Sequence, residues 1–355
     1  MTADALARRL AAIVPPDPAV AAVAQRRLDE LTKPPGSLGR LEELAVRLAV
    51  VRGAAPAVAR PVIFTFAADH GVAAEGVSAY PQSVTGQMLE NFLSGGAAIN
   101  VLARQAGAEL VVADFGVVGP LGPRPGLLDR RRGRGTRNMA IGPAMEPGDA
   151  VAAIDDGARL CDDAIAAGAD LVGTGEMGIA NTTAASAITA VLTGADPSVV
   201  TGAGTGVDAA GFARKVAVIR RAIDVNRPDR ADPLDVLAKV GGFEIAGLVG
   251  VILAAAARRV PVALDGFIAG AAALVAVRLA PAARETLLAA HRSAEPGHAV
   301  ILSDLGLTPY LDLGMRLGEG TGAALFVHLA RAAARISSEM ATFKSAGVDG
   351  PSEDR

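Results

Sequence analysis

Short, almost wholly apolar runs recur along the chain, and each is followed by glycines or polar residues. The clearest are residues 61–68 (PVIFTFAA) and 108–118 (AELVVADFGVV), and shorter ones are Leu171-Val172 and residues 260–264 (VPVAL). Such runs are typical of strands buried on both faces of a sheet. Longer segments with apolar residues at helical spacing lie between them. Strands that alternate with helices predict an α/β fold, a doubly wound, mostly parallel sheet with helices on both faces.

Both ends of the chain have a helical pattern without any strand-like run. Residues 3–14 and 18–31 predict two helices separated by Pro15-Pro16, and residues 322–336 predict a helix near the C-terminus. We therefore expect two parts: a small helical domain built from both termini, 1–58 joined by 325–355, and a Rossmann-like α/β catalytic domain, 59–324.

The composition narrows the class of protein. With 51% hydrophobic and 20% charged residues, the chain matches a packed globular protein rather than a disordered one. A net charge of −3 gives no overall field that would attract nucleic acid or a membrane surface. The longest apolar stretches, 245–257 and 267–277, are too short for a transmembrane helix. The single cysteine, Cys161, fits a reducing compartment. We expect a soluble, cytoplasmic protein.

Residues 169–189 contain the highest density of residues suited to binding a ligand. After Leu171-Val172, a glycine turn (Gly173, Gly175, Gly178) is predicted, followed by an alanine-rich helix. A strand, a glycine turn and a helix together present N–H groups to a phosphate. Glu176 inside the turn opposes an anion, so it is expected to face another part of the ligand. The alternative is a tight turn that binds nothing.

Other polar residues follow predicted strands and are expected at the same edge of the sheet. They are Asp69, Asp114 and Asp265, with a second glycine turn at residues 202–206. Lys215, on the helix after that turn, is a plausible phosphate partner. Asp69 and His70 are adjacent, so they point in different directions and are not expected to form a working dyad.

Two loops and one helix start leave both a functional and a structural interpretation open. The loop with Ser78, Tyr80 and Gln87 suits a pocket for a flat ring, and equally an ordinary surface loop. The arginine-rich loop 119–137 is predicted to be mobile and solvated rather than a nucleic-acid site. Glu319, between two glycines before a helix, is either a general base or an acid at a helix N-terminus, with Thr321 as the N-cap.

One motif supports a different activity. GTGEMG at residues 173–178 matches a dinucleotide fingerprint, with Asp196 twenty residues beyond Glu176, which would make the chain an NAD-dependent oxidoreductase. The four histidines show no i, i+4 pairing, so no metal is expected.

Seven motifs in order resemble one family over nearly the whole chain. They are GSLGRLE (36–42), AADHGV (67–72), GEMGIANTT (175–183), GAGTG (202–206), DGF (265–267), SAEPGH (293–298) and RLGEGTGAAL (316–325). Together they are similar to the nicotinate-nucleotide–dimethylbenzimidazole phosphoribosyltransferases, the CobT family. The resemblance implies transfer of the phosphoribosyl group of nicotinate mononucleotide to 5,6-dimethylbenzimidazole, which gives nicotinate and α-ribazole 5′-phosphate for the lower ligand of cobalamin.

The resemblance also implies a homodimer that needs no metal or other cofactor, and it assigns roles to residues. The general base is Glu319, and Glu176 stabilises or orients a cation. The nucleotide and phosphate positions are Gly175, Gly178, Gly202, Gly204, Lys215, Asp265 and Ser293. The base-binding positions are Ser78, Tyr80, Gln87, Met177 and Leu317.

The chemistry of the residues agrees with this resemblance. An attacking azole must lose its N–H proton, which one buried carboxylate can accept, whereas the pyridinium nitrogen of the leaving nicotinate becomes neutral and needs no acid. With Met177 and Tyr80 at the pocket, the sequence does not decide whether the acceptor is dimethylbenzimidazole, another azole, a purine or a phenol. A non-catalytic nucleotide sensor is the other class considered.

Overall fold

The core of the molecule is a parallel sheet. The computed structural model describes residues 3–53, 55–119, 122–204 and 206–350. Within these residues six strands form one sheet in the order β3-β2-β1-β4-β5-β6, and all paired neighbours are parallel. This is the doubly wound order, so the predicted α/β class is confirmed. The strands are β1 (Pro61–Ala68), β2 (Glu109–Gly116), β3 (Leu127–Asp129), β4 (Leu171–Met177), β5 (Val262–Leu264) and β6 (Leu287–Ala289).

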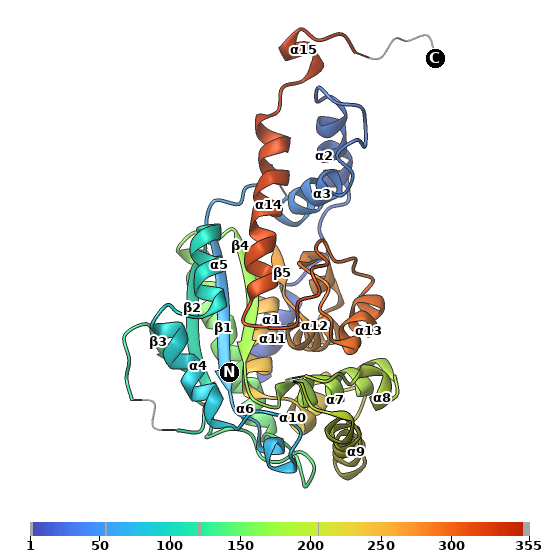
Figure 1. Cartoon of the computed structure of the whole chain (residues 1–355). Coiled ribbons are helices and arrows are strands. Elements are labelled where there is room, and N and C mark those ends of the chain that lie inside the picture. Colours follow the sequence, from blue (N-terminus) through green and yellow to red (C-terminus); the bar gives the residue numbers. More distant parts are fainter. Residues whose placement is uncertain (1–2, 54, 120–121, 205, 351–355) are drawn as a thin grey trace.

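Helices cover both faces of the sheet (Figure 1). The central strand β1 is buried along its whole length, as its apolar run predicts. Ile63 and Ala67 point to the side of α4 (Ser83–Leu93), α5 (Ala98–Ala106) and α14 (Thr321–Glu339). Phe64 and Phe66 point to the side of α6 (Pro147–Ala166), α11 (Phe243–Ala257) and α12 (Phe267–Leu279).

The main body contains further helices. They are η1 (Gly71–Glu75), α7 (Asn181–Thr193), α8 (Pro197–Val200), α9 (Ala209–Asn226), α10 (Pro233–Val240), η2 (Pro281–Thr286) and α13 (Pro296–Leu305). None of the helices within the described ranges is long and apolar enough to cross a membrane.

Helices from the two ends of the chain pack together at one end of the molecule. α3 (Arg40–Arg52) packs against α14, α2 (Ala19–Asp29) packs against α3, and the C-terminal α15 (Phe343–Ala346) follows (Figure 1). Backbone hydrogen bonds join Thr32 N–H to Ala341 O (3.0 Å) and Phe343 N–H to Glu30 O (3.1 Å). The apolar cluster of these helices continues into the sheet at Leu171. The predicted domain boundary therefore stays a prediction.

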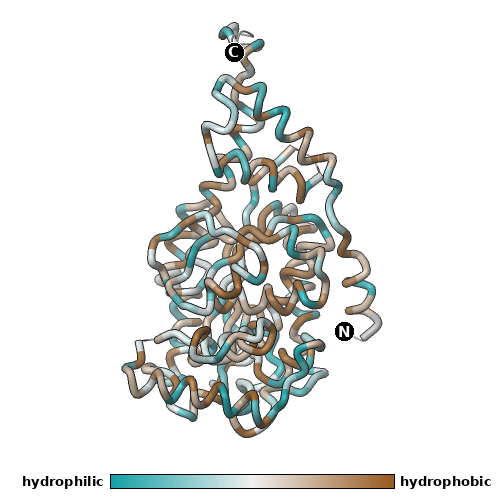
Figure 2. Tube along the Cα trace, turned by 90° about the vertical axis from the view of Figure 1, so that its right-hand side faces the viewer, coloured by the Kyte–Doolittle hydropathy of each residue, from teal (hydrophilic) through white to brown (hydrophobic). Residues whose placement is uncertain are grey.

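The first helix departs from the predicted grouping. α1 (Ala3–Ala11) packs against α6 and α11 of the main body instead of α2 and α3. It buries Leu6 in the main core, and Arg9 Nη2 lies 2.9 Å from Asp162 Oδ2. In Figure 2 the N-terminal segment accordingly lies beside the main body, far from the C-terminus.

The predicted loop 119–137 contains structure that the sequence did not reveal. Residues 120–121 lie outside the described part. Beyond them, β3 extends the sheet beside β2. Arg131 Nε lies 3.6 Å from Asp114 Oδ2 of β2, and Arg132 pairs with Asp156 of α6. These arginines therefore anchor the segment to the protein through carboxylates.

Candidate active site

A cavity of about 460 Å³ lies at the carboxyl end of β4. This is where strand order reverses between β1 and β4, the place where open α/β sheets bind ligands. Segments from distant parts of the chain line it. They bring together predicted residues from both sides of the site: Ser78, Tyr80, Glu176, Met177, Gly178, Gly204, Ser293, Leu317 and Glu319.

The other predicted residues do not line this cavity. Gln87 is exposed on α4, whereas Val84 and Met88, four residues apart on one helix face, line the cavity. Gly175, Gly202, Lys215 and Asp265 lie behind the cavity wall, where they support the segments that form it. The i, i+4 pairing of Val84 and Met88 was the signal that could have found the correct face.

The prediction of a glycine turn starting at Gly173 is wrong, because β4 continues through it to Met177. Gly173 and Gly175 pair within the sheet and face the start of α14. A Cβ added to Gly175 would lie 2.3 Å from the Glu319 carbonyl oxygen. These glycines therefore admit a close neighbour instead of cradling a phosphate. The actual turn comes later, at Gly178 and Ala180, where Ala180 has a φ of 75°.

Glu319 sits in a backbone conformation that L-residues rarely adopt. Its φ is 62°, and the flanking Gly318 and Gly320 have φ values of 85° and 92°. A left-handed residue other than glycine costs about 1–2 kcal/mol. Surrounding contacts hold it there. The side-chain Oε2 accepts a hydrogen bond from Ile99 N–H (3.2 Å).

The helix after Glu319 is capped by a distant residue. α14 begins at Thr321 with Gly320 at the N-cap, so the predicted Thr321 cap is wrong; the Thr321 hydroxyl donates to Gly318 O (2.8 Å). Asp265, just after β5, instead accepts from the N–H groups of Gly322 (2.7 Å) and Ala323 (3.1 Å). A carboxylate at this position satisfies exposed N–H groups and the positive end of the helix.

Two buried carboxyl groups face the cavity. Burial, reinforced by the nearby Glu244 and Asp265 charges, raises the pKa of Glu176 to about 8, although Asn181 donates a hydrogen bond to it. Burial also raises the pKa of Glu319, against the opposing effect of the Ile99 N–H group. The pKa of each group is thus moved toward the range in which a carboxyl group exchanges protons near neutral pH.

The second glycine loop is bound to its surroundings by side chains. Lys215 Nζ donates to Thr182 Oγ1 (2.8 Å) and Gly202 O (3.3 Å), and burial lowers its pKa to about 8. Glu295 Oε1 accepts from Gly204 N–H (3.1 Å), and Arg316 Nη1 donates to Gly204 O (2.7 Å). Thr205 of this loop lies outside the described residues. The loop thus joins α9 to the 316–319 wall of the cavity.

Comparison with known proteins identifies the family. A family model described as "Phosphoribosyltransferase" matches residues 13–348. Nicotinate-nucleotide–dimethylbenzimidazole phosphoribosyltransferase of Desulforudis audaxviator is 56% identical to this chain, and the match covers 99% of this chain and 100% of the relative. The enzyme of the same name from Roseiflexus sp. (strain RS-1) is also 56% identical, and the match covers 98% of this chain and 99% of the relative. The chain belongs to this family. Crystal structures of the CobT protein of Thermus thermophilus, 50% identical, superpose with a TM-score of 0.90 over 94% of this chain and 100% of that one.

Membership of this family agrees with the structure of the GTGEMG motif. Because Gly173 and Gly175 are strand residues, the motif does not form the phosphate-binding turn of a dinucleotide site. The oxidoreductase alternative therefore loses its structural basis, and none of the relatives described above carries such a name.

His70 and Asp69 are not a catalytic dyad, as predicted for adjacent residues. His70 Nε2 lies 2.7 Å from Glu244 Oε1, and both side chains are buried. Asp69 Oδ2 accepts from Val118 N–H (2.7 Å), which joins the ends of β1 and β2. Glu244 was not predicted, because only the fold brings the first turn of α11 beneath Gly178.

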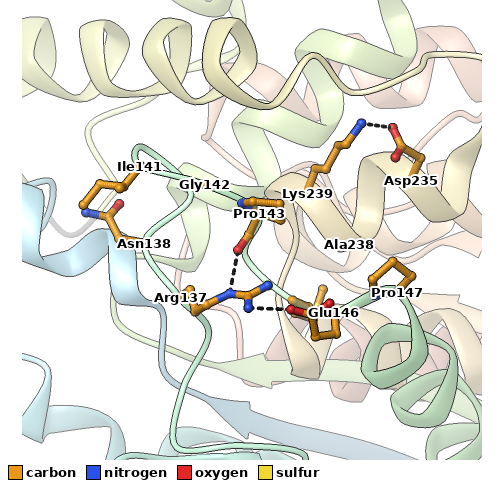
Figure 3. Close-up of a pocket in the computed structure, with 11 residues that line it drawn as sticks. Arg137, Asn138, Ile141, Gly142, Pro143, Glu146, Pro147, Asp235, Ala238 and Lys239 are labelled. Carbon is orange, nitrogen blue, oxygen red and sulfur yellow. Dashed lines mark hydrogen bonds and ion pairs between the residues drawn. The ribbon is translucent and has the colours of Figure 1, made fainter.

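A second cavity, of about 490 Å³, lies between residues 137–147 and α10 (Figure 3). Arg137 and Asn138 line this cavity and not the first. Its charged residues pair with one another: Arg137 Nη1 with Glu146 Oε1 (2.6 Å) and Lys239 Nζ with Asp235 Oδ2 (2.8 Å).

Proposed function

We propose that this protein transfers the phosphoribosyl group of nicotinate mononucleotide to 5,6-dimethylbenzimidazole, giving nicotinate and α-ribazole 5′-phosphate for the lower ligand of cobalamin. The observation that carries this proposal is the placement of Glu319. In a chain 56% identical to full-length members of the family, its carboxyl group is buried at the wall of a cavity large enough for two ring systems.

Glu319 is the general base of the reaction. One azole nitrogen attacks C1′ of the ribose, and the proton on the other azole nitrogen passes to the Glu319 carboxylate. The C1′–N bond to nicotinate breaks, and its electron pair stays on the pyridine nitrogen, which thereby becomes neutral. Attack from the face opposite nicotinate inverts C1′. One base is sufficient because the leaving group needs no proton.

Glu176 stabilises positive charge. Before a cation binds, its raised pKa keeps much of the group protonated at neutral pH. Both the pyridinium ring of the substrate and the ribosyl cation of the transition state favour the ionised carboxylate, so substrate binding lowers this pKa. Asn181 donates to the same carboxyl group and fixes its direction.

The cavity wall favours an apolar acceptor. Val77, Val84, Met88 and Met177 contribute apolar side chains beside Ser78 and Tyr80. Such a lining suits the methylated ring of dimethylbenzimidazole better than a purine with several polar edges. On the nucleotide side, Gly204 and Ser293 line the cavity, with Lys215 behind the 202–204 loop.

We further infer that the protein is a cytoplasmic homodimer, as the resemblance implies. Sedimentation equilibrium distinguishes this state from the 35.6 kDa monomer. We also propose, from the same resemblance, that the small helical part is a separate domain. It consists of α2, α3 and the C-terminal half of α14.

The proposed reaction is tested by mixing the protein with nicotinate mononucleotide and dimethylbenzimidazole and following nicotinate and the riboside phosphate by chromatography. We expect both products in equal amounts. Glu319→Gln is expected to lower turnover by about 10²- to 10⁴-fold, because the proton acceptor is lost, with the melting temperature retained. Glu339→Gln, the same change at the exposed end of α14, is the control and should leave turnover unchanged. Wild-type turnover in Glu319→Gln would exclude Glu319 as the base.

A further inference from the structure

The central strand β1 contains one polar side chain, Thr65, in an otherwise apolar run. Thr65 is fully buried, and it lies on the strand face shared by Ile63 and Ala67, toward α14. Valine has the same shape and would fill this position without a buried hydroxyl. The hydroxyl has one clear partner: Thr65 Oγ1 donates to the main-chain carbonyl of Glu319 at 2.7 Å.

The same peptide unit is held at its other end. The N–H group that follows the Glu319 carbonyl belongs to Gly320, and it donates to Asp265 Oδ2 (3.3 Å). On the preceding side, Glu319 N–H donates to the Glu176 carbonyl oxygen (3.2 Å). The backbone around Glu319 is thus tied to β1, to β4 and to the end of β5.

These ties matter because the segment itself has little conformational preference. Gly318 and Gly320 tolerate many conformations, and all three residues from Gly318 to Gly320 have positive φ. The direction of the Glu319 side chain follows from the orientation of its two peptide planes. The absence of a side chain on Gly175 lets the Glu319 carbonyl reach the sheet, where Thr65 meets it.

We propose that Thr65 is a positioning residue for Glu319: its hydroxyl fixes the Glu319–Gly320 peptide and so directs the Glu319 carboxylate into the cavity. The inference rests on the proposed role of Glu319 as the base. Thr65 is not among the residues that line the cavity, so it acts through the backbone of Glu319 and not on the substrate.

The test compares variants that keep the hydroxyl with variants that lack it. Thr65→Val keeps the shape and removes the donor, whereas Thr65→Ser keeps the donor and removes a methyl group. Thr65→Ala and Thr65→Ser form a second pair that differs by the hydroxyl. We expect kcat to fall about 10- to 100-fold in the Val and Ala variants, as for a catalytic group displaced by about 1 Å. The KM values for both substrates should stay within about threefold of wild type, and Thr65→Ser should restore most of kcat.

Each other result overturns the inference. A Val variant with wild-type kcat shows that the hydroxyl is dispensable. Equal losses in the Ser and Ala variants show that packing, not the donor, is responsible; this pair decides the question even if Thr65→Val fails to fold. If the proposed function is wrong, the wild type itself forms no product. If only the assignment of the base is wrong, Glu319→Gln keeps full turnover.

Discussion

Glu176 links the chemistry of the cavity to the stability of the fold. Its pKa is about 8 in the folded protein, raised by burial and by neighbouring carboxylates, against a value of 4.5 for the free side chain. Between these two pH values the folded state holds a proton that the unfolded chain releases. The free energy of unfolding must therefore fall as the pH rises from about 4.5 to 8, and the contribution of this group is fully present only below this range.

Glu176→Gln removes this dependence while its amide oxygen can still accept from Asn181. We expect the melting temperature of the wild type to fall relative to that of Glu176→Gln as the pH is raised from about 5 to about 9. Over this range the difference in unfolding free energy between the two proteins should change by on the order of a few kcal/mol. Calorimetry across this pH range measures the difference. Glu109→Gln, at an exposed position at the start of β2, should give a curve parallel to the wild type. If the Glu176→Gln curve also runs parallel, the carboxyl group is ionised in the fold.

Single residues differ in how far the sequence reveals them. Glu319 and Glu176 could be predicted because a carboxylate between glycines is locally unusual. Thr65 could not, since a threonine in a strand is ordinary until a carbonyl from residue 319 is found beside it. Gln87 does not line the cavity, whereas Val84 and Met88 of the same helix do, because composition identifies a pocket-forming segment but not which helix face points inward. Its base-binding role stays a prediction.

At the scale of elements, β4 shows why glycines mislead a local interpretation. Gly173 and Gly175 predict a turn, because glycine is depleted in strands. In the structure they stay in the strand, since Ala323 and the Glu319 carbonyl need the space that side chains would occupy. The reason for these glycines lies in a segment far along the chain, so no local pattern could have revealed it.

The contact between α6 and α11 depends on the same absence of side chains. A Cβ added to Gly157 would lie 1.9 Å from the Gly247 carbonyl oxygen, and one added to Gly250 would lie 1.9 Å from the Ile154 carbonyl oxygen. Both atoms are backbone and cannot move aside, so the two helices must separate to admit even a methyl group.

Gly157→Ala is therefore expected to destabilise the fold by about 1–3 kcal/mol or more, despite the better helix propensity of alanine. Gly148→Ala, the same substitution in the exposed first turn of the same helix, has nothing within 4 Å of the new methyl group and should leave stability unchanged or slightly raised. Urea titration of both variants measures the two effects. Equal stabilities would mean that the two helices leave room for a methyl group.

At the scale of the whole molecule, alternating apolar runs and helical segments were enough to predict the α/β class and the location of polar residues at strand ends. Strands β3 and β6, three residues each, were missed. β5 is equally short, but it lies within the apolar run 260–264, which was recognised. The position of α1 was missed for another reason. Its amphipathic pattern shows that one face is buried but not against which partner, and it packs on α6 and α11.

The cavity is lined by segments that lie far apart in the sequence and that only the fold brings together: residues 77–88, 176–182, Gly204, and residues 266–268, 291–295 and 316–319. A ligand that touches several of them stabilises the folded state as a whole, because unfolding would release it.

Nicotinate mononucleotide should accordingly raise the melting temperature of Glu319→Gln, in which it is bound without being consumed. At about a hundred times its Kd, binding contributes about 2.7 kcal/mol, which for 355 residues corresponds to a rise of about 3–4 °C. Nicotinate or ribose 5-phosphate alone reaches fewer of the segments and should give a smaller rise at equal concentration. Differential scanning fluorimetry measures all three. A melting temperature that does not respond to nicotinate mononucleotide, in a variant with wild-type stability, would mean that the folded variant does not bind this substrate. A rise in the variant without turnover separates substrate binding from proton transfer to the base.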